Sequence, residues 1–230
     1  MRALVPVVLS ALLLLSPAAQ AERNRAPSPS GTCEAAIARA EETGGLPAHL
    51  LDAIARVESG RPDRRTGRLV PWPWTINAEG TGTFFPTKAE AIAAVQRLQS
   101  RGVRSIDVGC LQINLMFHPD AFASLKEAFE PSSNARYAAH FLDALRAGTH
   151  DWLQAVADYH SQRPVLGKDY RDRVLALWRD PALPGSGLGL ATAYQDFIPD
   201  HRIFADFAGS SRAYAAFATT NAALAYNPRD

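Results

Sequence analysis

The chain has 230 residues, with 24 Lys and Arg against 23 Asp and Glu and a formal net charge of +1. This balance lacks the basic excess that is typical of nucleic-acid-binding proteins, so we expect no nucleic-acid partner. Hydrophobic residues make up 47% of the sequence, which is enough for a substantial core, and the length is consistent with one domain plus extensions.

The first 21 residues have the pattern of a secretory signal peptide. Arg2 precedes an apolar run over residues 3–15, and Ala19-Gln20-Ala21 supplies the small-x-small pattern that signal peptidase cleaves. A membrane anchor is the alternative, but the run is shorter than the roughly 20 residues needed to span a bilayer. We therefore expect cleavage after residue 21, secretion across the inner membrane and no stable membrane insertion of the mature protein.

Two cysteines remain after this cleavage, Cys33 and Cys110. Exported proteins reach an oxidising compartment in which such a pair can form a disulfide. The alternative is two buried free thiols, because Cys110 lies in an otherwise apolar stretch where a free cysteine packs well.

Helical patterns dominate the chain beyond the leader, which we place at residues 22–31 because it is rich in Pro, Ser and Asn. An Ala-rich helix is expected over residues 33–42, and a second helix has Pro47 in its first turn and ends near Gly60. Residues 69–86 instead predict a β-hairpin, the only convincing β signal.

Four further helices are expected after the hairpin. The first is predicted over residues 87–101, and the second runs from a cap at Ser133 or Asn134 to Gly148. The third begins after a cap at Asp151. The fourth lies before Pro181 and has the apolar stripe Tyr170, Val174 and Trp178. Residues 181–230 are rich in Pro, Gly and Ala and are read as a C-terminal extension without assigned structure. The sequence therefore predicts a mainly α domain over residues 32–180 with one small β-hairpin.

Glu58 is the candidate catalytic residue, and its place in the second predicted helix is the reason. It follows Ile54 by four positions and Leu51 by seven, so its side chain points where the core residues point. Burial and the negative end of the helix dipole both favour the protonated acid, which a general acid requires near neutral pH. The alternative is a surface ion pair with Arg56 or Arg61.

Other segments of the chain follow Glu58 in a recognisable order. They are Glu58-Ser59-Gly60, then Asp107-Val108-Gly109-Cys110-Leu111-Gln112-Ile113-Asn114, then Asn134 with Ala139-His140-Phe141-Leu142, then Ala157-Asp158-Tyr159-His160. In order and separation these segments resemble the motifs of the lytic transglycosylase SLT domain of bacterial cell-wall enzymes. The resemblance extends over roughly residues 33–178, and four short motifs in the family order are hard to obtain by chance.

The resemblance implies a lysozyme-like α domain that acts in the periplasm on the glycan strands of peptidoglycan. It implies cleavage of the bond between N-acetylmuramic acid (MurNAc) and N-acetylglucosamine (GlcNAc), with 1,6-anhydro-MurNAc ends, no cofactor and Glu58 as the sole acid/base. Substrate-binding roles are implied for Ser59, Gly109, Gln112, Ile113 and Tyr159, with the Tyr159 hydroxyl orienting the catalytic carboxyl. The chain departs from the family pattern at Cys110, Leu111, Phe141, Asp158 and His160.

Several readings stay open at this point. A muramidase that lets water attack would need a second carboxylate or an open water path, and Asp107 is the nearest rival, although we interpret it as a structural residue before the Gly109 turn. A non-catalytic wall-binding or assembly protein is the third possibility, and a secretion or surface apparatus is a possible partner.

No His-Glu-x-x-His pair is present, so no zinc site is expected. The predicted hairpin region is an insert without a counterpart in the family motif, and it carries four aromatic residues: Trp72, Trp74, Phe84 and Phe85. These side chains could stack on sugar rings or be buried within the hairpin.

Overall fold

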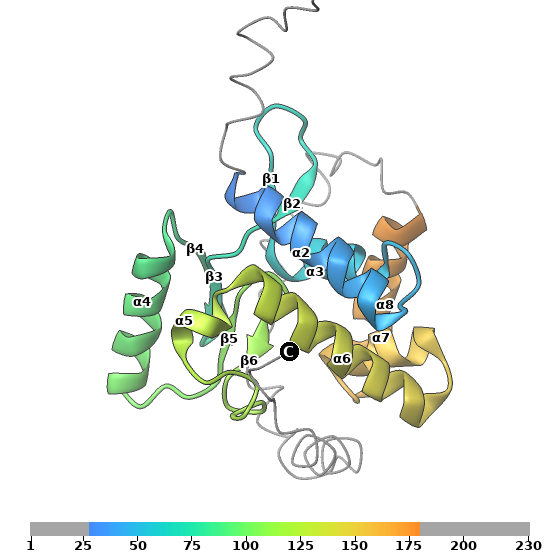
Figure 1. The fold of residues 1–230 in the computed structure, drawn as a ribbon. Coiled ribbons are helices and arrows are strands. Elements are labelled where there is room, and N and C mark those ends of the chain that lie inside the picture. Colours follow the sequence, from blue (N-terminus) through green and yellow to red (C-terminus); the bar gives the residue numbers. More distant parts are fainter. Residues whose placement is uncertain (1–27, 180–230) are drawn as a thin grey trace, which may run out of the picture.

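The computed structural model describes residues 28–179, and these residues form seven helices and six short strands. In chain order they are α2 Pro29–Gly44, α3 Leu50–Ser59, β1 Gly60–Pro62, β2 Leu69–Pro71, β3 Thr75–Ala78, β4 Thr81–Phe84, α4 Lys88–Ser100, β5 Ile106–Val108, β6 Ile113–Asn114, α5 Leu125–Ala128, α6 Pro131–Thr149, α7 Trp152–His160 and α8 Pro164–Arg179. The mainly α character predicted from the sequence is confirmed (Figure 1). The expected signal peptide and C-terminal extension lie outside the described residues. Over residues 28–179, no helix combines the length and the apolar character that crossing a bilayer would require.

Five helices share the larger of two hydrophobic cores. Apolar side chains of α2, α3, α6, α7 and α8 pack together there, with Leu50, Leu51 and Ile54 of α3 fully buried at its centre. The stripe predicted on the last helix is in this core, because Tyr170 and Val174 are buried and Trp178 packs against them. The helix α3, which carries Glu58, is therefore fixed on several sides.

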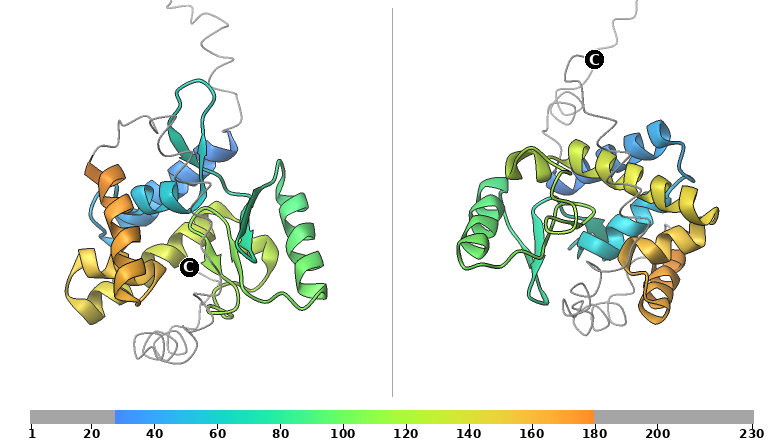
Figure 2. Two further views of the ribbon diagram at one scale, coloured as in Figure 1. Left: turned by 180° about the vertical axis from the view of Figure 1, so that it is seen from behind. Right: turned by 90° about the horizontal axis from the view of Figure 1, so that it is seen from below.

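The second core lies under a four-stranded antiparallel sheet with strand order β4-β3-β5-β6. Ile76 and Ile106 of the sheet pack there against Val95 of α4 and against Phe129, which follows α5. Figure 2 shows α4 and the sheet at one end of the molecule and α8 at the other. The described part of the chain is thus built as a helical lobe and a sheet lobe, each with its own core.

The predicted hairpin is present as β3 and β4, but it is only part of the β structure. Its loop is the pair Glu79-Gly80, with φ of 52° and 77°, the double positive φ of a type I′ turn that matches strand twist. The strands β5 and β6 widen this sheet, and β1 pairs separately with β2. The prediction of a single hairpin was therefore wrong, because strands of two or three residues carry too little alternation to be recognised.

Three predicted helix starts also need correction. Helix α2 begins at Pro29, within the expected leader, because the Ser28 hydroxyl accepts from the backbone N–H of Gly31 (3.1 Å) and caps it. Helix α3 begins at Leu50 rather than with Pro47 in its first turn. Its first N–H groups are capped by the Glu41 carboxylate of α2, which accepts from Leu51 at 2.7 Å.

Helix α6 begins at Pro131, so neither Ser133 nor Asn134 caps it. Proline suits this position because its fixed φ is already helical and its missing N–H is not needed in the first turn. The cap predicted at Asp151 is confirmed, since its side chain accepts from the N–H of Leu153. The helix predicted from residue 87 begins at Lys88, capped by the Thr87 hydroxyl, which accepts from the N–H of Glu90. Asn134 lies inside α6 with no exposed surface, and its side chain bonds to other parts of the chain, as described below.

The two cysteines form the disulfide that the sequence suggested. Cys33 of α2 is bonded to Cys110, in the turn between β5 and β6, across 77 positions of sequence. Both residues are fully buried in the core of the helical lobe. The bond therefore ties α2 to the turn that carries the Gly109-to-Asn114 motif.

Candidate active site

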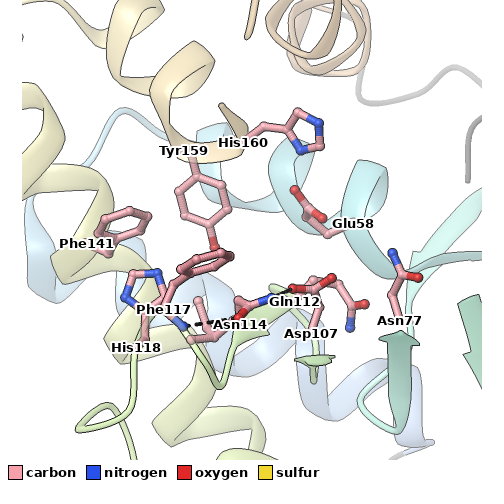
Figure 3. Close-up of a pocket in the computed structure, with 11 residues that line it drawn as sticks. Glu58, Asn77, Asp107, Gln112, Asn114, Phe117, His118, Phe141, Tyr159 and His160 are labelled. Atoms are coloured by element: carbon pink, nitrogen blue, oxygen red, sulfur yellow. Dashed lines mark hydrogen bonds between the residues drawn. The ribbon is translucent and has the colours of Figure 1, made fainter. Parts of the chain in front are cut away.

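A cavity opens between the helical lobe and the sheet lobe (Figure 3). Together with the solvent-open space at its mouth it holds about 570 Å³. Its lining residues come from α3, the sheet, the segment after β6, α6 and α7; they are Glu58, Asn77, Asp107, Gln112, Ile113, Asn114, Phe117, His118, Phe141, Tyr159 and His160. Residues that are far apart in the sequence, including members of all four motif segments, thus converge on one space.

Glu58 faces this cavity from the last turn of α3. Burial raises the pKa of its carboxyl from the ordinary 4.5 to about 7, although the Tyr170 hydroxyl and the positive charge of Arg173 both lower it. At neutral pH a large fraction of Glu58 therefore carries a proton that it can donate.

The alternative reading of Glu58 as a surface ion pair is not what the structure shows. Arg56 is 2% exposed and pairs instead with Asp52 at 3.8 Å, while its Nε donates to Leu69 O. The guanidinium of Arg61 lies over the Trp72 ring, 4.2 Å from its centre. The inward orientation expected from helical periodicity is confirmed.

The phenol that interacts with Glu58 belongs to Tyr170 of α8, not to Tyr159 as expected. The Tyr159 hydroxyl donates to Leu111 O at 2.9 Å, so the ring lines the cavity but its hydrogen is directed to the backbone. The Tyr170 hydroxyl lowers the pKa of Glu58, although among the described residues it has no partner of full hydrogen-bond geometry. The sequence marked Tyr170 only as a core position in a helical stripe, because periodicity does not reveal where a buried hydroxyl lies.

Ser59 was expected in the substrate site, but it has no exposed surface and does not line the cavity. Its hydroxyl donates to Cys110 O at 2.6 Å. This bond links the end of α3 to the turn between β5 and β6. Ser59 thus has a structural role, holding the helix that carries Glu58 against the cavity floor.

The floor of the cavity is built by that same turn. Gln112 and Ile113 line the cavity as expected, and the Gln112 amide donates to Gly109 O (2.9 Å) and Thr75 O (3.1 Å). Gly109 itself is not in the lining; it has a φ of +85°, and a Cβ at this position would collide with the Asn134 amide. Its role is to allow the tight turn.

Asn134 holds this turn from α6. Its side chain accepts from Leu111 N (2.9 Å) and donates to Val108 O (3.0 Å) and Ala128 O (3.1 Å). Three buried backbone groups are bonded to this one side chain. The amide is therefore the connection between α6, the sheet and the cavity floor.

Asp107 is more than the structural residue that the sequence suggested, because it lines the cavity together with Glu58. In the sheet it lies directly between Asn77 and Asn114, and directly opposed residues share one face. The Asn114 amide donates to its Oδ1 at 2.7 Å. Burial, and then the negative charge of Glu58, raise the pKa of Asp107 to about 8, against the lowering by Asn114.

The cavity has a second, aromatic end, and Figure 3 shows His118 and Phe141 there, away from Glu58 and Asp107. The His118 ring lies 4.7 Å from Phe141, and its Nδ1 is 2.9 Å from the Tyr137 hydroxyl. Burial lowers the pKa of His118 to about 4, so the ring is neutral at physiological pH. The sequence gave no signal for His118, since an isolated histidine in a loop carries no periodicity.

The aromatic insert does not reach the cavity. Trp72 and Trp74 pack edge to face at 5.7 Å, and Trp72 Nε1 donates to Phe85 O at 2.7 Å. Trp74 and Phe85 also pack against the core of the sheet lobe. These aromatic side chains are therefore partly buried and pack within the sheet lobe. Over residues 28–179, no group of three or more His, Cys, Asp or Glu side chains is placed to hold a metal ion.

Comparison with known proteins adds no further guidance. No protein-family model, curated protein or solved structure matches this chain.

Proposed function

We propose that this protein is a peptidoglycan lytic transglycosylase with a lysozyme-like fold, in which Glu58 is the catalytic acid and base. The observation that carries the proposal is the Glu58 carboxyl, which lines a cavity and has its pKa raised to about 7 by burial. A glycosidic oxygen leaves only when it is protonated, and a carboxyl with this pKa still holds a proton near neutral pH.

The proposed reaction needs no second carboxylate. Glu58 donates its proton to the oxygen between MurNAc and GlcNAc, and the C–O bond to the anomeric carbon breaks. The acetamido oxygen of the sugar stabilises the positive carbon, as in substrate-assisted glycosidases. The Glu58 carboxylate then removes the proton of the muramyl 6-hydroxyl, whose oxygen closes the 1,6-anhydro ring and restores the acid.

The surrounding residues suit a hexosamine substrate. The amides of Asn77 and Asn114 lie on the cavity-facing side of the sheet, where they offer donors and acceptors for sugar hydroxyl and acetamido groups. At the other end, Phe117 and Phe141 offer apolar ring surfaces. A polar wall and an aromatic wall are typical of small-molecule sites that bind and orient a ligand.

Export to the periplasm is itself part of this proposal. Residues 1–21 would direct the chain across the inner membrane to the periplasm, where peptidoglycan is the substrate and where the disulfide between Cys33 and Cys110 can form. A secretion or surface apparatus that requires a local opening in the wall is the proposed partner.

Hydrolysis by a muramidase is the second candidate, and Asp107 is the observation that favours it. Two carboxyl groups face one cavity, as the two-carboxylate scheme of most glycosidases requires. The pKa of about 8 argues against Asp107 as a base at neutral pH, because a protonated carboxyl cannot activate water. Mass analysis of the muropeptides decides, since the anhydro product is one water lighter than the hydrolysed one.

Digestion of purified sacculi tests the proposal against a binding protein without activity. We expect the unaltered protein to release anhydro-muropeptides and Glu58→Gln to release none while remaining folded. Glu42→Gln is the matched control, because Glu42 is an exposed glutamate of α2. Sacculi that stay intact with the unaltered protein, but bind it, would support the wall-binding alternative instead.

A further inference from the structure

His160, the last residue of α7, lies against the residue that interacts with the catalytic acid. Its ring is stacked on the ring of Tyr170 in α8, with centres 4.6 Å apart and planes within 7° of parallel. Both residues are buried, and His160 also lines the cavity, next to Glu58 in Figure 3. It stands where the motif of the resembled family has asparagine, so the contact belongs to this chain.

The connection between the two helices forces this stacking. At Gly167, in the first turns of α8, a Cβ would lie 2.6 Å from Ser161 O and 3.1 Å from Ala157 O. Only glycine permits α8 to approach the end of α7 so closely. This close approach of the two helices brings the His160 and Tyr170 rings into contact.

Tyr170 is the link to Glu58. The His160 ring stacks on its ring, and the Arg173 guanidinium lies 5.5 Å from the centre of the Tyr170 ring. Within residues 28–179, no group bonds the Tyr170 hydroxyl with full hydrogen-bond geometry. Its position near Glu58 is therefore set by the packing of the ring rather than by a hydrogen bond to a third residue.

We propose that His160 is a positioning residue that acts through Tyr170: its flat ring holds the Tyr170 hydroxyl where it can donate to the Glu58 carboxylate. This inference rests on the proposed function and deepens it, because that carboxylate is the species that forms once the acid has given up its proton. The role needs an aromatic ring and not an exchangeable proton. A phenylalanine at position 160 should therefore keep it, and an alanine should lose it.

The test compares His160→Phe, His160→Ala, Tyr170→Phe and the double variant His160→Ala/Tyr170→Phe. His140→Ala is the control, because His140 is an exposed histidine of α6. Two quantities are measured for each protein: kcat and KM on purified glycan strands, and the pKa of Glu58 from the titration of its ¹³C-labelled carboxyl, assigned by its absence in Glu58→Gln. The second readout needs no substrate, and Arg173 and Asp107 are unchanged in every variant.

We expect His160→Ala and Tyr170→Phe each to lower kcat about tenfold with KM unchanged, the size expected for one hydrogen bond to a charged group. The double variant should be no worse than either single variant, since both remove the same interaction. The pKa of Glu58 should rise in His160→Ala as it does in Tyr170→Phe, because the hydroxyl stabilises the carboxylate. His160→Phe and His140→Ala should match the unaltered protein.

Three results would overturn the inference: additive losses in the double variant, a Glu58 pKa in His160→Ala that is unchanged or lower, or a loss in His160→Phe as large as in His160→Ala. The last would mean that a ring nitrogen is required. If the unaltered protein cleaves no glycan, the proposed function fails. The pKa titration still decides whether His160 positions Tyr170.

Discussion

Glu58→Gln replaces a partly buried carboxyl by an amide of the same shape, and its effect on stability should depend strongly on pH. Below pH 4.5 the carboxyl is protonated in both the folded and the unfolded chain, so the two proteins should be about equally stable. Above that pH the unfolded chain releases its proton, while the folded protein keeps it until about pH 7. Because the folded-state pKa is the raised one, the unaltered protein loses stability as pH rises through this window.

The size of the effect follows from the pKa. Moving it from 4.5 to about 7 corresponds to about 3 kcal/mol, since one pKa unit is about 1.4 kcal/mol. Glu58→Gln cannot ionise and escapes this loss, and it also removes the charge that repels the Asp107 carboxylate. At pH 8 the variant should therefore be more stable than the unaltered protein by about 3 kcal/mol.

Urea unfolding at several pH values between 4 and 8, with the disulfide intact, measures this difference. Glu42→Gln, at an exposed position of α2, is the control; it keeps Glu58, so its stability should follow that of the unaltered protein at each pH. A Glu58→Gln advantage below about 1 kcal/mol at pH 8 would refute the reasoning. It would mean that the carboxyl is well solvated and holds no proton near neutral pH, and the acid role would lose its physical basis.

Three further changes test the support of the cavity floor, and a fourth tests the reaction. Asn134→Ala removes three hydrogen bonds to buried backbone groups and should cost about 3 kcal/mol in urea unfolding. Gly109→Ala, at a φ of +85° and against the Asn134 amide, should cost about 2 kcal/mol or more. Replacing Cys33 and Cys110 by serine opens a link across 77 positions and should cost about 4 kcal/mol. Asp107→Asn should still release anhydro-muropeptides; a loss of cleavage of about 100-fold in a folded variant would favour the two-carboxylate muramidase.

The parts of the fold that the sequence predicted depend on local patterns. Thr87 and Asp151 cap the helices that follow them because each side chain reaches an N–H two or three residues away. The inward direction of Glu58 follows from its spacing to Leu51 and Ile54 along one helix, which does not require knowledge of the rest of the fold.

The parts that could not be predicted depend on contacts between distant segments. The cap of α3 comes from Glu41 of the preceding helix, so no residue next to Leu50 marks the start. The strand β5 pairs with β3 across about thirty positions and is buried throughout, so its three residues show no alternation. The Tyr170 hydroxyl meets Glu58 only once α8 has packed against α3.

The motif residues fall into two groups, those that line the cavity and those that lie behind it. Gln112 and Ile113 line the cavity, whereas Ser59 and Gly109 lie behind it and hold its walls. A short motif identifies residues that a site requires. It does not separate those that meet the ligand from those that keep the backbone in place.

The division into two separately packed lobes has a consequence for how this cavity can vary. Glu58 and its partner Tyr170 are carried by the helical lobe, whereas Asn77 and Asp107 are carried by the sheet lobe. Substitutions within the core under α4 can tilt or shift the polar wall while the proton donor keeps its surroundings. Under the proposed function, changes in the sheet lobe alone would alter the preference among glycans and leave Glu58 intact.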